Sequence, residues 1–126
     1  MSEYKSGVMS TDNKRDQIWE SLHDREYRKE FGSANINVGL AFQIHGLRQR
    51  QKLTREELAG LMGITEQGVQ ALEDPNYERY SLKILQKLAA VFDVALLVKF
   101  VPFSTLVDWE VNLTSDTIAP PSFEVE

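Results

Sequence analysis

The chain contains no cysteine among its 126 residues, which excludes disulfide bonds, thiolate metal sites and cysteine nucleophiles. It has only two histidines, His23 and His45, and neither has a partner at the spacing of a metal-binding pair. Long apolar runs are also missing. No apolar run is longer than five residues, as in residues 94–98, which is far shorter than the roughly 20 residues of a membrane-spanning helix. The first 13 residues lack the apolar core of a signal peptide. We therefore expect no metal, no cofactor and no membrane partner, and a cytoplasmic protein.

An excess of positive charge is lacking too, since the formal net charge is −5. Residues 104–126 contain five acidic groups and no basic one, so the charge of this segment alone equals the net charge of the whole chain. The remainder of the chain is neutral. Any binding to an anionic partner would therefore depend on a local basic surface, at distances comparable with the screening length of about 8 Å.

What is present is the composition of a folded protein, with 42% hydrophobic and 26% charged residues. The length fits one domain with extensions. The sequence shows no nucleophile–base pair, no phosphate-binding loop and no metal-ligand spacing, so we do not expect an enzyme.

Apolar periodicity divides the chain into segments, and the predicted class is mainly α with a short C-terminal β element. Residues 32–35 (Gly-Ser-Ala-Asn) are interpreted as a break between two helical regions. The predicted segments are a flexible arm (1–15), a helical extension (16–34), a helical bundle (35–93), a β element (94–114) and an acidic flexible tail (115–126).

Two short helices are predicted within the bundle. Thr54 and Glu57 have the spacing of a capping box, and Gly63 is the residue type that ends a helix in the left-handed conformation. Thr65 can cap a second helix, which ends before Pro75. A connection of about three residues requires the two helices to cross steeply. Ala59, Gly63, Val69 and Leu72 provide the small, flexible or apolar side chains that such a crossing needs, and Ser81 begins a further helix.

These residues resemble the Cro and lambda-repressor-like helix-turn-helix family, also called XRE. The resemblance covers roughly residues 38–92 and rests on four motifs: Ile44-x-x-Leu47-Arg48, Leu53-Thr54-x-x-Glu57-Leu58-Ala59, Met62-Gly63-Ile64-Thr65 and Val69-x-x-Leu72-Glu73. It implies a lambda-repressor-like helical bundle that binds double-stranded DNA and regulates transcription, more often as a repressor.

In that family the second helix of the motif enters the major groove. The resemblance assigns the base-reading positions to Glu66, Gln67, Gln70 and Ala71. Glutamine amides match the donor and acceptor of adenine, a carboxylate can accept from cytosine, and a methyl group can contact thymine. The candidate phosphate-binding residues are Arg48, Lys52, Arg55, Tyr77, Arg79 and Lys83.

Two residues of the second helix are unusual for this use. Glu66 places a carboxylate near phosphates. Gly68 lowers the helix propensity by up to about 1 kcal/mol relative to alanine. Either Gly68 allows the backbone to approach DNA closely, or the helix no longer reads a groove.

The C-terminal third shows strand-like patterns. Residues 95–101 are apolar on both faces, and residues 107–113 alternate apolar with polar. Because an isolated hairpin is barely stable in water, its edge invites pairing with a second copy. We therefore expect a homodimer with a shared sheet that binds a palindromic operator. The predicted dimerisation residues are Leu96, Val98, Phe100 and Val101.

Two alternatives to a dedicated regulator remain at this point. In the first, the chain is an antitoxin that binds a toxin protein and also represses their shared promoter. In the second, it is a helix-turn-helix interaction module without DNA binding, which Glu66, Gly68 and the acidic balance favour.

Overall fold

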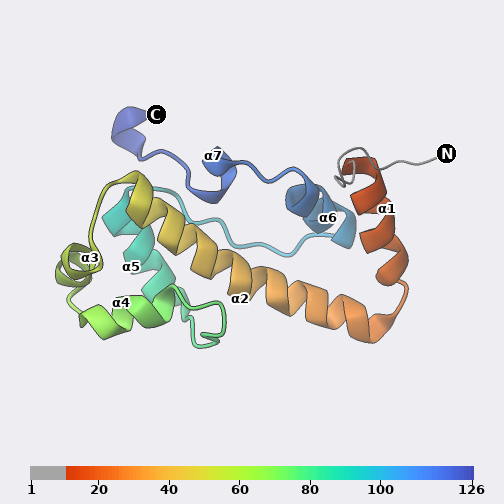
Figure 1. The fold of residues 1–126 in the computed structure, drawn as a ribbon, viewed down its shortest axis with the longest axis horizontal. Helices are drawn as coiled ribbons and strands as arrows, with labels where there is room; N and C mark the ends of the chain where they lie inside the picture. The colour runs from red at the N-terminus through yellow and green to blue at the C-terminus, as the bar shows by residue number, and fades with distance from the viewer. Residues whose placement is uncertain (1–10) are drawn as a thin grey trace, which may run out of the picture. The chain divides into compact units, whose positions relative to one another are not determined.

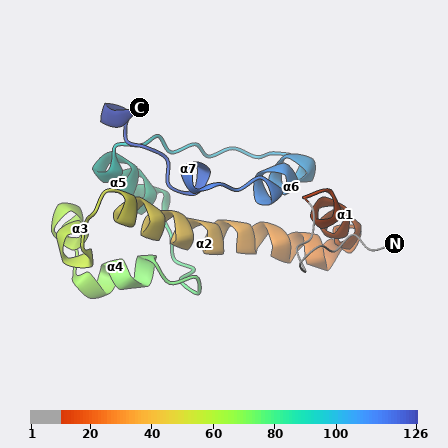
Figure 2. The same ribbon diagram turned by 45° about the horizontal axis from the view of Figure 1, so that its top comes forward.

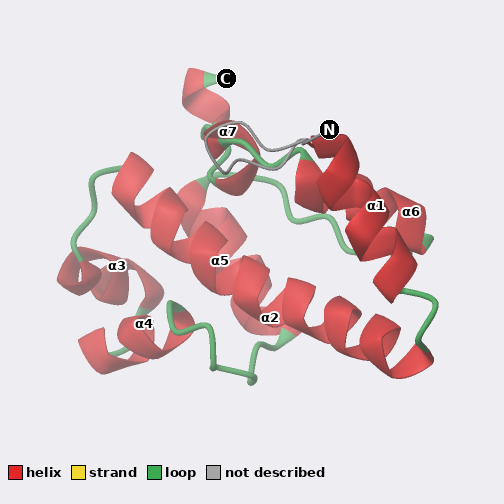
Figure 3. Cartoon of the chain, turned by 45° about the vertical axis from the view of Figure 1, so that its right-hand side comes forward, coloured by secondary structure: helices red, strands yellow, loops and turns green. Residues whose placement is uncertain are grey.

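The computed structural model describes residues 11–126, and these are mainly helical (Figure 3). The helices are α1 (Thr11–Ser21), α2 (Arg25–Arg50), α3 (Arg55–Met62), α4 (Glu66–Leu72), α5 (Leu82–Phe92), α6 (Phe103–Val111) and α7 (Ser115–Ile118), followed by the short 3₁₀ helix η1 (Phe123–Val125). The predicted mainly-α class is confirmed. The predicted C-terminal β element is wrong, because residues 11–126 contain no strand.

The chain divides into two compact units. Within the described residues, unit 1 comprises residues 11–32 and 99–113, and unit 2 comprises residues 33–98 and 114–126. Helix α2 contributes residues to both units. The predicted arm lies mostly outside the described residues, and its last part, residues 11–15, belongs to α1.

Helix α2 is continuous through residues 32–35, so the predicted break there is wrong. The physical reason is that this segment has weak helix formers but no proline. A single glycine costs a helix up to about 1 kcal/mol, which 26 residues of helix with buried anchors easily tolerate. Those anchors are Ala41, Ile44 and Leu47, which lie on one stripe of α2.

The core of unit 2 lies where α3, α4 and α5 gather around the C-terminal end of α2 (Figures 1 and 2). Leu58, Met62 and Val69 are fully buried there, and Phe92 of α5 is nearly so. All four are apolar residues at the helical spacings of the sequence pattern. Their burial fixes the two short helices α3 and α4, which have too few residues to be stable alone.

The predicted ends of these helices are confirmed. The Glu57 amide donates to the Thr54 hydroxyl at 3.0 Å, and the Thr54 amide donates to the Glu57 carboxylate at 2.8 Å, which completes the capping box. Helix α3 ends at Gly63, whose φ of 69° lies in the left-handed region. Thr65 accepts from the amide of Gly68 at the start of α4, and Ser81 accepts from Ile84 at the start of α5.

Residues 94–102 have no regular secondary structure, and most of residues 107–113 belong to α6 instead of a strand. The alternating pattern was ambiguous, because Phe103, Leu106, Val107 and Val111 also recur at helical spacing. Within unit 1, α6 packs against α1, and Val107 is almost fully buried. A helix that buries Val107 while it packs against α1 prevails over a strand that has no partner.

Residues 115–126 differ from the flexible tail that their composition suggested. Ala119 belongs to the core of unit 2, and an added Cβ on Gly46 would lie only 3.3 Å from it. Arg50 donates to the carboxylate of Asp116 at 2.7 Å and to the carbonyl of Ala119 at 2.8 Å. The segment is therefore held on α2 by packing and by hydrogen bonds.

Candidate functional site

Helix α4 presents the predicted base-reading residues on its outer side. Glu66, Gln67 and Gln70 are exposed, and Ala71 is half-buried. Val69 and Leu72, on the opposite side, are buried in the core with exposed fractions of 0% and 3%. This segregation follows from the helical period, because residues 66, 67, 70 and 71 share one face. The outer face of α4 is therefore polar and accessible within its unit.

Gly68 does not belong to that outer face. A Cβ at this position would lie 3.3 Å from Ile64 Cδ1 and 3.4 Å from the Thr65 hydroxyl, so the residue faces the turn between α3 and α4. Glycine is explained here by close packing on the turn. Neither close approach of the backbone to DNA nor loss of a reading function is needed to account for it.

A buried carboxylate joins α4 to the two helices behind it, and the sequence analysis missed it. Glu73, immediately after α4, has only 2% of its side chain exposed. Arg48 of α2 donates to it through Nε at 2.6 Å and through Nη2 at 3.1 Å, the two-pronged geometry typical of arginine and carboxylate. His45 Nδ1 lies 2.9 Å from Glu73 Oε1, and Arg55 Nε of α3 lies 3.4 Å from the same oxygen.

The charge of Glu73 is stabilised by this surrounding. Burial on its own raises the pKa of the Glu73 carboxyl, but hydrogen bonds from Arg48 and His45 and their positive charge together lower the pKa below its ordinary value. The carboxylate is therefore ionised at neutral pH. We call Glu73, Arg48, His45 and Arg55 the Glu73 network, and it connects the end of α4 to α2 and α3.

The Glu73 network takes up two of the predicted phosphate-binding residues. Arg48 is 12% exposed, and its Nη1 also donates to the carbonyl of Leu53 at 3.0 Å. Arg55 is more accessible, with 40% of its side chain exposed, and lies at the edge of the network. The guanidinium of Arg48 thus has a structural role in this arrangement, whereas Arg55 is open to a partner on one side.

The other four predicted phosphate-binding residues are not part of the Glu73 network. Lys52 is exposed at the end of α2 and has a φ of 59° in the left-handed region. Arg79 and Lys83 are exposed on and after the loop that follows α4. Tyr77 is half-buried against Tyr80, with ring centroids 4.9 Å apart. Contacts between these residues and phosphate stay a prediction.

The predicted dimerisation residues lie in the segment between α5 and α6. Leu96 is half-buried, whereas Val98, Phe100 and Val101 are exposed. Since this segment is not a strand, the shared sheet has no basis among residues 11–126. The homodimer itself stays a prediction.

Among residues 11–126, no group of three or more His, Cys, Asp or Glu side chains could hold a metal ion, and no helix is long and apolar enough to cross a membrane.

The α4 face of unit 2 carries accessible hydrogen-bonding groups. Gln67 and Gln70 each carry an amide with both a donor and an acceptor, and they are one helical turn apart. Neither amide forms a hydrogen bond with any other side chain or backbone group of residues 11–126.

Comparison of the chain with protein-family models, with curated proteins and with solved structures found no match in any of the three.

Proposed function

We propose that the chain is a sequence-specific DNA-binding regulator of transcription, with α4 as the helix that reads the major groove. The observation that carries this proposal is the exposed pair of glutamine amides on a short helix whose other side is anchored in the core. Recognition of bases needs side chains of this kind held in a fixed orientation. The resemblance of residues 38–92 to the lambda-repressor-like helix-turn-helix family, in which α3 and α4 form the motif, supports the same function.

Each residue of the α4 face has a role in this proposal. Gln67 or Gln70 forms the paired contact with adenine, Glu66 accepts from a cytosine amino group, and Ala71 contacts a thymine methyl. Glu66 also sets a requirement: its carboxylate repels phosphates unless a base satisfies it, so a wrong base pair is disfavoured. The α4 face thereby gives specificity more than affinity.

Affinity for the phosphate backbone comes from the residues around this face. Lys52, Arg55, Arg79 and Lys83 are the candidate cations, and Tyr77 is a candidate hydroxyl donor. Arg48 acts indirectly, since it holds Glu73 and with it the end of α4. The partner is double-stranded DNA, read as a palindromic operator by a homodimer, with recognition helices about 34 Å apart.

The test is selection of binding sites from a pool of randomised duplexes with the full chain, followed by affinity measurements across a salt series. Replacing Gln67 and Gln70 together by alanine should reduce the preference for the selected site over random DNA by roughly 5- to 150-fold for each lost paired contact. The slope of affinity against salt should not change, because phosphate contacts are retained.

A matched control carries the same chemical change elsewhere. Gln17 on α1 and Gln86 on α5 are exposed glutamines outside the α4 face. Their double replacement by alanine should leave site preference and salt slope as in the wild type. Equal loss of preference in both double variants, or unchanged preference in the Gln67 and Gln70 variant, would contradict the assignment of α4.

A second function class has a specific observation in its favour. Glu73 neutralises Arg48 and Arg55, two of the cations that a DNA-binding surface would use. This favours an interaction module that binds a protein and no DNA. Failure of the wild type to bind any duplex, even at low salt, would favour that class. An antitoxin would combine both functions, because it would bind a toxin protein and also its own promoter.

A further inference from the structure

Unit 1 has a very small core for the apolar surface that it carries. Among its described residues, the buried hydrophobic ones are Leu22 and Val107. Several large apolar side chains of the same unit are exposed: Trp19, Tyr27, Phe100, Phe103, Trp109 and Leu113. A group of exposed large apolar side chains is typical of a surface that associates with a partner.

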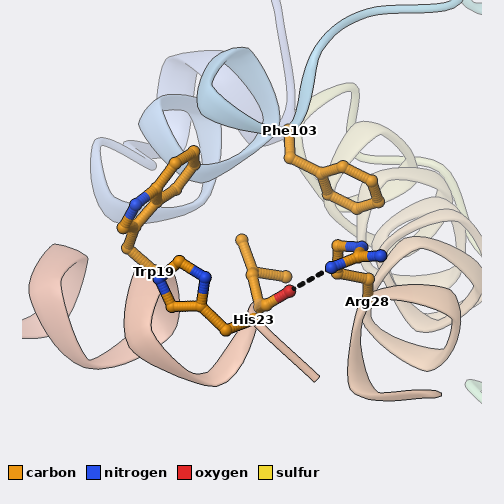
Figure 4. A pocket seen from close by; sticks show the side chains of 5 residues that line it. Trp19, His23, Arg28 and Phe103 are labelled. Carbon is orange, nitrogen blue, oxygen red and sulfur yellow. Dashed lines mark hydrogen bonds between the residues drawn. The ribbon is translucent and has the colours of Figure 1, made fainter. Parts of the chain in front are cut away.

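An apolar pocket of about 240 Å³ opens on this surface. It is lined by Trp19, Leu22, His23, Arg28 and Phe103, and Figure 4 shows Trp19 and Phe103 on opposite sides of the space. Arg28 Nη1 donates to the carbonyl of Leu22 at 2.9 Å, which fixes the wall formed by α1 and the start of α2. The volume lies below the range of about 300–1,000 Å³ that is typical of pockets for small-molecule ligands. It suits a single large side chain.

Unit 1 also presents a side chain of that kind. Phe100 is fully exposed, so it does not fill the pocket of its own chain. A fully exposed phenylalanine in an otherwise folded segment loses much of its hydrophobic stabilisation, since burial of such a side chain contributes about 1.5–3 kcal/mol. The unit therefore carries both a projecting aromatic ring and an unfilled aromatic pocket.

We propose that unit 1 is a dimerisation surface on which Phe100 of each copy enters the Trp19–Phe103 pocket of the other copy. The inference rests on the homodimer of the proposed function and names its interface, but it does not depend on DNA binding. It replaces the expected shared sheet by an exchange of side chains, and it retains Phe100 among the dimerisation residues.

A second copy is the occupant that fits these features together. A two-fold interface uses the same surface on both partners, so a ring and a pocket on one unit are satisfied twice in a dimer. Any other protein would have to supply a pocket and a ring of its own. Charges of both signs alternate along α1 and the first turns of α2, so the surface has no single-sign field that would repel a copy or attract an anionic membrane.

The first experiment measures the mass of the full chain by sedimentation over a range of concentrations, without DNA. The wild type should be a dimer, and Phe100→Asp should raise the dimer dissociation constant by at least about 100-fold, as expected for an anchor residue repeated by symmetry. Phe123→Asp is the matched control, because Phe123 is also strongly exposed but lies in unit 2. It should remain dimeric. Circular dichroism checks that each variant keeps its helices.

The decisive experiment mixes two defective variants. Trp19→Ala damages the pocket and keeps Phe100, whereas Phe100→Asp keeps the pocket and loses the ring. Each alone should be monomeric, but the mixture should form heterodimers with one intact contact of the two. A destabilised fold could not be rescued by mixing, so this result would specifically support the exchange.

Three outcomes would overturn the inference. They are a monomeric wild type at high concentration, a Phe100→Asp variant that dimerises like the wild type, and a mixture that stays monomeric. Deletion of residues 2–10 tests the one competing occupant within the chain. The measurement is the fluorescence of Trp19 in a Trp109→Phe variant, with and without residues 2–10. If the wild type is monomeric and the deletion changes this fluorescence, the N-terminal residues and not a second copy fill the pocket.

Discussion

Replacing Glu73 by alanine should destabilise the protein strongly, although Glu73 lies outside the hydrophobic core and immediately follows the end of α4. The change removes a carboxylate with 2% exposure and leaves Arg48, which is 12% exposed, without its charge partner. Removing one partner of a buried ion pair costs about 3–5 kcal/mol, because the other charge stays buried and unpaired. For a unit of this size the melting temperature should fall by at least about 12 °C.

Thermal and urea unfolding followed by circular dichroism provide the measurement. Glu66→Gln is the matched control, since it changes an exposed glutamate at the start of α4, and it should alter the free energy of unfolding by less than about 0.5 kcal/mol. The double variant Glu73→Leu with Arg48→Met should recover much of the loss, because apolar side chains of similar size can replace a buried pair. The reasoning is refuted if Glu73→Ala lowers the free energy of unfolding by under about 1 kcal/mol. It is also refuted if the loss in the double variant equals the sum of the losses in the single variants Glu73→Leu and Arg48→Met.

The pH dependence follows from the lowered pKa of Glu73. The folded state holds its proton less tightly than the unfolded state, whose carboxyl has the ordinary value of 4.5. The stability from this group is therefore fully present above pH 4.5 and is lost as the pH falls through the lower pKa of the folded state. The difference between the wild type and Glu73→Ala should accordingly narrow in acid, and a constant difference down to pH 2 would contradict the role of the charge.

Two further predictions concern the turn and the loop that flank α4. Gly63→Ala should lower the free energy of unfolding by about 1–2 kcal/mol, because a side chain is forced into the left-handed conformation; Gly60→Ala in the interior of α3, with open space around it, should not be destabilising. Equal effects in urea unfolding would disprove this reasoning. Burial, with nearby Tyr77 and Asp74, raises the pKa of Tyr80 to about 12, and its hydroxyl donates to the Leu72 carbonyl at 2.6 Å. The stability from Tyr80 is full below pH 10 and is lost as the pH rises through about 12. Ultraviolet titration should show a late-ionising tyrosine that Tyr80→Phe removes.

Local signals in the sequence were sufficient for the helices of unit 2. Thr54 with Glu57, Gly63, Thr65 and Ser81 each act on their own neighbours, so their effect can be predicted without knowing the fold. The outer face of α4 followed in the same way from the helical period. These parts agreed with the structure because local and tertiary preferences coincide.

Features that depend on distant residues were not predictable in this way. The link between Glu73 and Arg48 spans 25 positions, and a charged residue beyond a short helix reads as an exposed one. The signal available in the sequence was that Arg48 and Glu73 each end one of the four motifs on which the resemblance rests. The segment around Val107 fitted both a strand and a helix, and packing against α1 decided between them.

The way Ala119 lies against Gly46 has a practical consequence for anyone who divides this protein into pieces. A fragment that ends at Phe92, the last residue of α5, would retain every residue of α3, α4 and α5. It would nevertheless lack residues 114–126, in which Ala119 lies against Gly46 of α2 and accepts a hydrogen bond from Arg50. The folded body is thus discontinuous in sequence, and a shortened protein should keep residues 114–126 if its α2 surface is to stay covered.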